Sequence, residues 1–480
     1  MIRSHALATL VLAALAAPLQ AQQPPTEFGD VNRVEAGTPT NVVMAAYKTT
    51  MLADGEDEVL IRTFVTDSAG RQIMSADRIM RIYVNGDATV DRPATTLYAV
   101  TPRTDDEGAD YWETRLVDGS SAFILKSGDT VDRIQVEVRS GDLPPAGHEI
   151  HTIAADVELL EPTTDQLENL RAQAIRDLPP MIGADISFLP QREANGAIYT
   201  DAGEERDAVR ILADNGLNFV RLRIFVNPEN PEGYSPEQGF AGLEYTKQMA
   251  RRIDAAGMGF LLDFHYSDYW ADPQQQNKPL AWRDLDFEGL KAAMRRYTTQ
   301  VVLELTDQGT PPDMVQVGNE INHGLLWPEG HIQNLDNLAE LLQAGIQGVE
   351  DANPDLPVML HIALGGQNEE SRFWLDNMIA RGVQFDLIGL SFYPRWHATL
   401  DDLKANLHDL ADRYGLPLNV VEYSPFAAEV HEIVFGLPNG LGNGTAIWEP
   451  LRLFFDEETR APTPELRLYN RLSDRYLGSS

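Results

Sequence analysis

Cysteine is absent from the 480 residues of the chain. This absence excludes disulfides, zinc–thiolate sites, iron–sulfur clusters and cysteine nucleophiles. It is also compatible with export into an oxidising compartment, where unpaired cysteines risk wrong pairing. Thiol chemistry therefore has no part in the function.

Basic residues are scarce, because 38 Lys and Arg face 73 Asp and Glu, for a formal net charge of −35. Nucleic acid is recognised through a basic surface, so no nucleic-acid partner is expected. An anionic membrane surface or a polyanionic substrate would be repelled in the same way. The share of apolar residues, 43%, is that of a soluble globular protein. A neutral substrate fits this composition best.

Long hydrophobic runs are confined to the N-terminus. Ala6–Ala17 is small and apolar and is ended by Pro18. The run is too short to cross a bilayer, which takes about 20 residues, and Ala21 offers a small residue for cleavage. We predict a signal peptide at residues 1–21, no membrane span, and a bacterial protein exported to the periplasm or the medium.

A period-two pattern of apolar residues runs through residues 41–160. Short β-branched runs separated by turn-forming clusters predict an all-β sandwich. Ala53–Ile73, followed by Ser127–Val138, resembles bacterial Ig-like modules. The sequence leaves open whether this region binds glycan, tethers the protein or acts as a spacer. We expect residues 22–40 to be a linker and residues 161–178 to be a capped helical connector.

Residues 179–480 alternate buried apolar runs with stretches of helical periodicity. The runs expected to be strands are Met181–Ala184, Phe219–Phe225, Gly259–Phe264, Met314–Val317, Val358–Ile362, Leu387–Ser391, Leu418–Val421 and Thr445–Trp448. This alternation favours a (β/α)8 TIM barrel, an α/β fold, over a doubly wound open sheet. No glycine-rich phosphate loop follows any of these runs, so nucleotide binding has no support.

Polar residues gather where these strands end, which is the side of such a barrel that carries the active site. They are Asp185, Arg221, Arg223, Asp263, His265, Asn319, Glu320, Ser391, Tyr393, Glu422, Trp448 and Glu449. Arg221 and Arg223 point the same way, since side chains alternate along a strand.

Two carboxylates facing each other across a barrel mouth suit glycoside hydrolysis, in which one is protonated and the other ionised. An arginine such as Arg221 beside one of them would keep it ionised. Taken singly, these residues also fit structural roles: Glu422 as an ion-pair partner, His265 as a core histidine. Their joint placement favours catalysis by Glu320 and Glu422.

Five long segments of the chain follow one another in a recognisable order. They are Met181–Pro228, Gly257–Trp282, Pro312–Asn322, Leu325–Gly330 and Asp386–Leu400. Together they resemble the endo-β-1,4-galactanases of glycoside hydrolase family 53. The resemblance implies a (β/α)8 barrel, a retaining mechanism and a polysaccharide substrate, the β-1,4-galactan of type I arabinogalactan.

The resemblance also implies a role for each matching position. Glu320, in Gly-Asn-Glu, matches the acid/base of the family, and Glu422, in Val-Val-Glu, matches its nucleophile. Asn319 would hold the 2-hydroxyl of the substrate, and Tyr393 would lie beside the nucleophile. The further positions expected to bind substrate around the cleft are Asp185, Arg221, His265, Trp282 and Trp448.

The chain departs from the family pattern after Glu422. It continues Tyr423-Ser424-Pro425-Phe426, where the family usually has Thr-Ala-Tyr/Phe-Pro. The segment from Phe426 to Thr445 is too short for both the long loop of the family and a full helix. That loop binds calcium in some members, so its shortening puts calcium in doubt, and no cofactor is expected.

The sequence thus predicts retaining, endo-acting hydrolysis of β-1,4-galactosidic bonds, with Glu320 as acid/base and Glu422 as nucleophile. Two alternatives remain. One is a related retaining glycosidase that acts on another β-glycan or from a chain end, because the shortened segment reshapes the cleft. The other is a barrel that binds carbohydrate without cleaving it, which the presence of both glutamates disfavours. The sequence does not indicate the oligomeric state.

Overall fold

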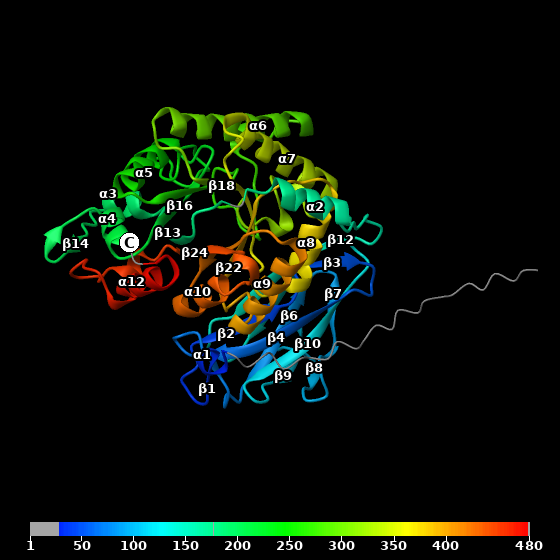
Figure 1. Ribbon diagram of the computed structural model, residues 1–480. Helices are drawn as coiled ribbons and strands as arrows, with labels where there is room; N and C mark the ends of the chain where they lie inside the picture. The colour runs from blue at the N-terminus through cyan, green and yellow to red at the C-terminus, as the bar shows by residue number, and fades with distance from the viewer. Residues whose placement is uncertain (1–27, 176, 479–480) are drawn as a thin grey trace, which may run out of the picture.

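The computed structural model describes residues 28–175 and 177–478. The predicted signal peptide lies outside the described residues. A region of strands, residues 33–154, is followed by a helix-rich region that contains a closed barrel (Figure 1). No helix in the described part is both long and apolar enough to cross a membrane.

The strand-rich region consists of two sheets. The first contains β1 (Arg33–Val34), β5 (Gln72–Ile73), β4 (Glu58–Thr66), β10 (Ser120–Ser127) and β7 (Ala88–Pro93) in this order, and β2 (Asn41–Ala46) also pairs with β4. The second contains β3 (Thr50–Ala53), β12 (Ala146–Ala154), β11 (Arg133–Arg139), β6 (Ile79–Asn85), β9 (Asp110–Arg115) and β8 (Val100–Thr104).

Alternating apolar residues hold the two sheets together. In β11, Ile134, Val136 and Val138 are buried while their neighbours are more exposed. They pack with residues of the other sheet, such as Ile61 and Phe123, in one apolar cluster. The all-β prediction for this region is confirmed, whereas its likeness to Ig modules stays a prediction.

Two segments lie before and after the sheets. Within the expected linker, residues 29–34 form a short helix, α1 (Gly29–Asn32), and strand β1, which pairs with β5. The connector contains α2 (Thr164–Gln173), and Thr163 caps it in a capping box with Gln166. Both segments are therefore part of the folded protein.

Eight parallel strands close the barrel, which confirms the predicted fold class. Their order is β13 (Met181–Asp185), β16 (Phe219–Ile224), β17 (Gly259–Phe264), β18 (Met314–Val317), β21 (Val358–Ile362), β22 (Leu387–Phe392), β23 (Leu418–Tyr423) and β24 (Gly442–Trp448).

Helices surround the strands, and short elements occupy some of the loops. The helices are α3 (Leu189–Ala194), α4 (Ala208–Asp214), α5 (Leu243–Ala256), α6 (Phe287–Asp307), α7 (Leu335–Ala352), α8 (Asn368–Ala380), α9 (Leu400–Tyr414), α10 (Ala427–Phe435), α11 (Leu451–Phe454) and α12 (Pro464–Tyr476). The short elements are β14 (Thr200–Asp201), β15 (Glu204–Glu205), β19 (Gly324–Leu325), β20 (Gly330–His331), η1 (Leu280–Trp282), η2 (Ile321–His323) and η3 (Pro438–Gly440).

The barrel interior changes from apolar to polar along the strands. One residue of each strand contributes to a buried apolar cluster: Met181, Phe219, Leu261, Met314, Met359, Leu387, Val421 and Ala446. Because side chains alternate, residues two positions further on point into the same interior. At that level Arg221, Asp263, Gln316 and His361 are buried. The apolar layer thus forms the floor beneath a polar layer at the carboxyl ends of the strands.

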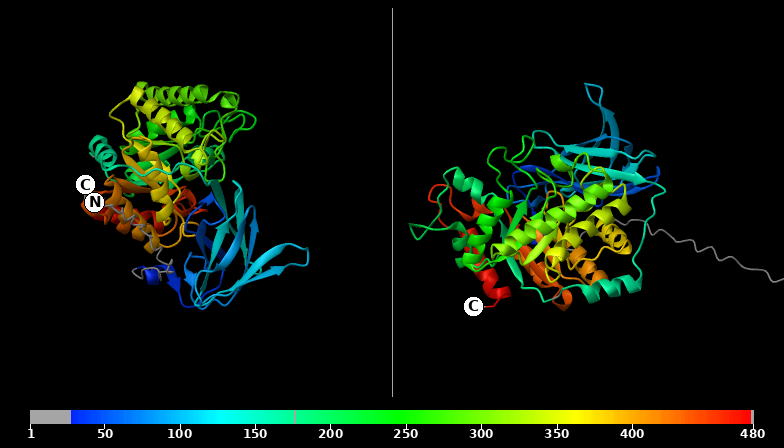
Figure 2. Two further views of the ribbon diagram at one scale, coloured as in Figure 1. Left: turned by 90° about the vertical axis from the view of Figure 1, so that its right-hand side faces the viewer. Right: turned by 90° about the horizontal axis from the view of Figure 1, so that it is seen from above.

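The two regions lie side by side (Figure 2), and buried polar groups connect them. The side chain of Glu370, at the start of α8, contacts Thr49 and Thr50 of the strand-rich region. Thr49 Oγ1 is also 2.8 Å from His323 Nε2. Neutral His323 donates its Nδ1–H to the carbonyl of Pro273, so Nε2 accepts the hydroxyl proton of Thr49. The 2.8 Å contact of Thr49 Oγ1 with Glu370 Oε1 then calls for a protonated Glu370.

Three histidines extend this interface. The His151 ring stacks on His323 at a centroid distance of 3.9 Å, and its Nδ1 lies 2.8 Å from His331 Nε2. Burial lowers the pKa of His151 to about 3 and that of His331 to about 4. All three rings are therefore neutral and pack as aromatic groups. The barrel and the strand-rich region form one continuous buried structure at this point.

The pKa of Glu370 makes this interface sensitive to pH. Burial raises that pKa from 4.5 to about 7. A raised pKa adds stability below the unfolded value, and that stability is lost as the pH rises through the folded value. Between pH 4.5 and pH 7 we expect wild type to lose on the order of 3 kcal/mol relative to Glu370→Gln. Thermal midpoints of both proteins across this range measure the difference.

The neighbouring Glu369, whose side chain is 72% exposed, provides the matched control. The difference between wild type and Glu369→Gln should not change over the same pH range. A difference between wild type and Glu370→Gln that is equally independent of pH would show that Glu370 is ionised in the folded protein.

Candidate active site

Glu320 and Glu422 line a common cavity of about 590 Å³. Binding sites for small molecules have volumes of roughly 300–1,000 Å³. Glu320 lies in the loop after β18 and has left-handed backbone with φ of 49°, after Gly318 with φ of 88°. Such strain in a non-glycine residue is retained where the surrounding structure fixes it, often at functional sites.

Glu422 reaches the cavity because of an irregularity in β23. Strict alternation after the interior residue Val421 would turn the next side chain outward. Here Leu390 pairs with Val420, but the next pair is Ser391 with Glu422, so the register shifts by one residue. This bulge turns the Glu422 side chain inward, whereas Tyr423 packs among the residues outside the barrel.

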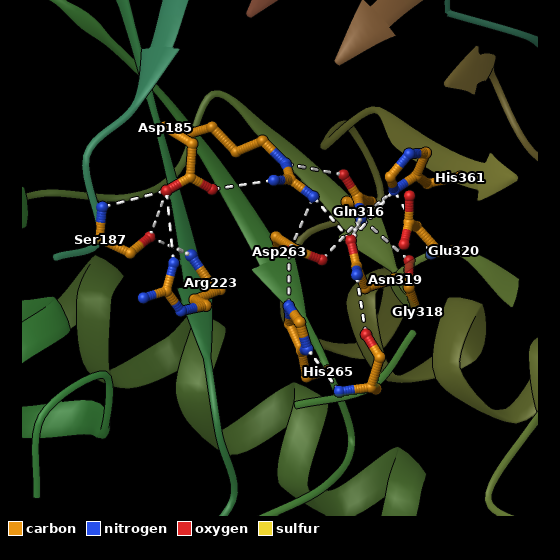
Figure 3. Close-up of polar contacts among 12 residues, drawn as sticks. Asp185, Ser187, Arg223, Asp263, His265, Gln316, Gly318, Asn319, Glu320 and His361 are labelled. Carbon is orange, nitrogen blue, oxygen red and sulfur yellow. Dashed lines mark hydrogen bonds and ion pairs between the residues drawn. The ribbon is translucent and has the colours of Figure 1, made fainter. Parts of the chain in front are cut away.

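Arg221 is the centre of the polar layer, and Figure 3 labels its partners Asp185, Asp263, Gln316 and Asn319. Its guanidinium lies 2.8 Å from Asp185, 2.9 Å from Asp263 and 2.9 Å from Glu422. It also donates to Gln316 Oε1 and Asn319 Oδ1. Its side chain is 1% exposed, so these partners, not water, compensate the buried charge.

Glu422 is bound through both carboxyl oxygens. Oε1 contacts Arg221, and Oε2 accepts a hydrogen bond of 3.0 Å from the Tyr393 hydroxyl. Burial raises the pKa of Glu422, and the Arg221 charge and the Tyr393 hydrogen bond act against that rise. The expectation that Arg221 lies beside this carboxylate is thus met by the geometry.

Glu320 has a different environment. Its Oε1 accepts a hydrogen bond of 2.7 Å from Ser391 Oγ, and Ser391 lies 2.9 Å from His361 Nε2. Because Ser391 donates to Glu320, His361 must donate its Nε2 proton to Ser391. Burial first, and the nearby charge of Glu422 second, raise the pKa of Glu320 well above 4.5. Glu320 therefore holds its proton more strongly than Glu422.

The loop after β17 supports Asn319, the residue before Glu320, from one side. His265 contacts Asp263 Oδ2 at 3.1 Å through Nε2, and its Nδ1 accepts the backbone N–H of Ala271. The carbonyl of Ala271 in turn accepts a hydrogen bond of 2.9 Å from Asn319 Nδ2. Asn319 is therefore fixed on both sides, and its second amide proton remains for a ligand.

Aromatic side chains surround the cavity. Trp270 and Trp448 line it with their centroids 6.4 Å apart, and Trp396, which is 41% exposed, lines it as well. Arg223 packs between Trp270 and Phe188, at 4.2 Å and 4.3 Å from the ring centroids. Flat apolar surfaces beside carboxylates and amides suit the faces and hydroxyls of a sugar.

The expected site residues fall into three groups. Asn319, Glu320, Tyr393, Glu422 and Trp448 line the cavity. Asp185, Arg221 and His265 are buried beneath it and hold the lining residues in place. Trp282 does neither, because it is buried at the end of η1 and packs edge-to-face on Tyr297, 5.9 Å away.

Sequence reasoning missed two residues of the network, Gln316 and His361. Gln316 binds Arg221 and Asp263, and His361 orients Ser391. Both stand inside runs that were interpreted as purely apolar strands. Each lies two positions after a methionine of the apolar floor, and that spacing is the signal that identifies them.

The arrangement supplies the two groups that acid–base and nucleophilic chemistry on an acetal requires. A carboxyl with a strongly raised pKa can donate a proton, and a carboxylate held by a guanidinium and a phenol can attack. Burial raises the pKa of both groups; the Glu422 charge adds to the rise for Glu320, and the Arg221 charge opposes the rise for Glu422.

Comparison with known proteins places this arrangement in a family. The sequence profile of glycosyl hydrolase family 53 matches residues 181–443. This chain belongs to glycosyl hydrolase family 53. It is accordingly a glycoside hydrolase, and the matched range contains the barrel strands up to the start of β24.

Individual relatives agree with this placement. An arabinogalactan endo-β-1,4-galactanase of Humicola insolens is 38% identical over 249 residues, which are 50% of this chain and 72% of that protein. One of Aspergillus niger is 34% identical over 304 residues, 56% of this chain and 84% of the relative.

Solved structures give the same result for the fold. A fungal β-1,4-galactanase matches with a TM-score of 0.55 and 31% identity, over 60% of this chain and 98% of the other. The family 53 catalytic domain of Ignisphaera aggregans matches with a TM-score of 0.57 and 29% identity, over 62% and 98%.

The residues between β23 and β24 do not fit a calcium site. The acidic side chains between Phe426 and Thr445 are Glu429 and Glu432, both on α10. Throughout residues 28–175 and 177–478, no group of three or more His, Asp or Glu is arranged to hold a metal ion. Helix α10 occupies much of this segment.

The two raised pKa values predict a bell-shaped pH profile of hydrolytic kcat/KM. Activity is lost as the pH falls through the Glu422 pKa, which lies above 4.5, and as it rises through that of Glu320. The Ser391 hydrogen bond lowers the Glu320 pKa. Ser391→Ala should therefore move the alkaline limb to higher pH and leave the acid limb in place. Movement of the acid limb alone would contradict the assignment.

Replacement of Arg221 tests the acid limb of the same pH profile. Arg221→Lys retains one charge but cannot contact Asp185, Asp263 and Glu422 together. We expect kcat/KM to fall by about 10²- to 10³-fold, as for the loss of one preorganised electrostatic group. The acid limb should move to higher pH. Arg467→Lys, on the exposed face of α12, is the control and should retain wild-type kinetics.

Proposed function

We propose that this protein cleaves β-1,4-galactosidic bonds in galactan by an endo-acting, retaining mechanism, with Glu422 as nucleophile and Glu320 as acid/base. The substrate follows from the names of the family relatives. The single observation that carries the mechanism is the contrast between the two carboxyls. Glu422 is bound by Arg221 and Tyr393, and Glu320 is buried with Ser391 as its hydrogen-bond donor.

In the first step Glu422 attacks the anomeric carbon from one face of the sugar. The bond between that carbon and the bridging oxygen breaks, and its electron pair goes to the oxygen. Glu320 gives its proton to this oxygen, and the shortened galactan leaves. The product of this step is a galactosyl ester of Glu422.

In the second step water attacks the same carbon and the ester bond breaks. Glu320 takes the proton of the water, which requires its pKa to fall after the first step. The ester supplies this fall, because it removes the negative charge of Glu422 that raises the Glu320 pKa. Two inversions leave the product with the configuration of the substrate.

Other residues have supporting roles in this proposal. The free amide proton of Asn319 binds the 2-hydroxyl of the reacting sugar, and Trp448 stacks on a sugar face. Asp185, Arg221 and His265 act from below as positioning residues.

Azide distinguishes the roles of the two glutamates. In Glu422→Ala, azide enters the vacated space and restores turnover with the inverted product. The test substrate for Glu320→Ala is an activated aryl galactoside, whose leaving group needs no acid. This substrate still forms the ester with Glu422, and azide then gives the product with retained configuration. Galactan hydrolysis by Glu320→Ala should fall by about 10²- to 10⁴-fold. NMR of the azide adduct determines the configuration.

Exposed Glu432 on α10 supplies the control, and Glu432→Ala should act like wild type. The reverse pattern of adducts would exchange the two roles. Variants that both retain more than a tenth of wild-type activity would refute the catalytic pair. Cleavage of a different β-glycan in place of galactan would refute the substrate.

We also propose that the protein is exported to the periplasm or the medium. The proposal rests on the apolar run Ala6–Ala17 and the small residue Ala21 in the sequence. N-terminal sequencing of protein recovered from the producing bacterium should begin at Gln22. A cytosolic protein that retains residues 1–21 would contradict export.

A further inference from the structure

One wall of the catalytic cavity comes from outside the barrel. Thr49, Gly147, His148 and Glu149, all from the strand-rich region, line the cavity that holds Glu320 and Glu422. These lining residues precede residue 181, where the match to the family begins. We call Thr49 and Gly147–Glu149 the β-wall. The family match therefore does not extend to the β-wall.

The contacts of the strand-rich region place the β-wall on the Glu320 side of the cavity. They reach the loop after β17 through Arg133 and Gln274, and the loop after β22 through Arg395, which donates to the carbonyl of Pro145. Thr49 contacts His323, in the same loop as Glu320.

The position of the acid decides which part of a substrate faces this wall. Glu320 gives its proton to the bridging oxygen, so the leaving sugar lies on the Glu320 side of the broken bond. The sugar that becomes attached to Glu422 lies on the other side. The β-wall therefore faces the leaving group.

His148 offers an unused acceptor in this wall. Its Nε2 is buried and has no hydrogen-bond partner. The ring bonds the backbone of Met44, and burial lowers the His148 pKa to about 4. The proton of the neutral ring is therefore on Nδ1, toward Met44, and Nε2 carries a lone pair. A hydroxyl group of a ligand would donate the hydrogen bond that this buried acceptor lacks.

Further residues line the cavity beside His148. His148 and His397 line the same cavity, and Trp396 precedes His397 in the same loop. Trp396 presents an exposed aromatic face to the cavity. Glu149 binds Arg133 and His151 through Oε1.

The interface makes the β-wall a fixed part of the cleft. Glu149 binds His151, which stacks on His323, and His323 Nε2 binds Thr49. The β-wall is thus connected at both of its segments to the loop that carries Glu320. A preorganised wall loses little entropy when a sugar binds.

We propose that the β-wall forms the leaving-group subsite, in which His148 Nε2 accepts a hydroxyl of the leaving sugar and Trp396 stacks on its face. This inference rests on the proposed function and adds the recognition of the leaving part. Substrates whose leaving group is a sugar gain binding energy from the β-wall, and substrates whose leaving group is a simple phenol do not.

Two substrates with the same galactosyl part separate these cases. One is a β-1,4-galacto-oligosaccharide, whose leaving group consists of galactose units. The other is an activated aryl galactoside, whose leaving group is a phenol. In His148→Ala we expect kcat/KM to fall about tenfold on the oligosaccharide, the cost of one hydrogen bond, and to stay within twofold on the aryl substrate. Trp396→Ala should show the same selectivity.

Two further variants distinguish the loss of this hydrogen bond from a folding defect. His148→Gln retains an acceptor oxygen and should recover most of the loss on the oligosaccharide. His408→Ala, on α9, removes a histidine away from the cavity and should match wild type on both substrates.

Each remaining outcome overturns the proposal. Equal losses on both substrates would mean that the β-wall acts on the galactosyl part or only on structure. No loss on either would mean that the leaving sugar does not touch His148. If wild type cleaves neither substrate, the proposed function itself fails and the inference fails with it, a result distinct from selective failure of the variants.

Discussion

The buried guanidinium of Arg221 is the interaction on which the rest of the site depends. A charge that is 1% exposed needs partners, and Asp185, Asp263 and Glu422 provide them. Those carboxylates would repel one another without it. Each is fixed in turn, Asp185 by Ser187 and Asp263 by His265. The Arg221 charge acts against the rise that burial causes in the Glu422 pKa, whereas the pKa of Glu320 is raised first by burial and second by the charge of Glu422.

Much of this arrangement could be predicted from the sequence because it is local. Each barrel strand was visible as an apolar run, and polar residues at the strand ends identified Arg221, Glu320 and Glu422. Gln316 and His361 were missed, although each follows the apolar floor by the spacing that places Arg221 two residues after Phe219. The inward turn of Glu422 depends on a register shift that arises only when β22 and β23 pair.

Non-local packing accounts for what the sequence could not show. Trp282 was expected at the cleft, yet the turn of η1 places it against Tyr297. The role of the strand-rich region was left open, because no pattern in residues 41–160 indicates which barrel loops it will contact. One buried cluster joins the two regions, and it consists of Glu370, Thr49 and His323. A cleft with walls from both regions is a property of the whole chain.

The most direct test of the account is the identity of the residue that becomes covalently attached to substrate. An activated galactoside with fluorine in place of the 2-hydroxyl should form the ester and hydrolyse it slowly, because fluorine destabilises the positive charge of the transition state and replaces the hydroxyl that we propose Asn319 binds. Peptide mass spectrometry of the trapped protein should find one galactosyl group on Glu422, bound in the free protein by Arg221 and Tyr393. Label on Glu320, or no label although the compound is turned over, would contradict the mechanism.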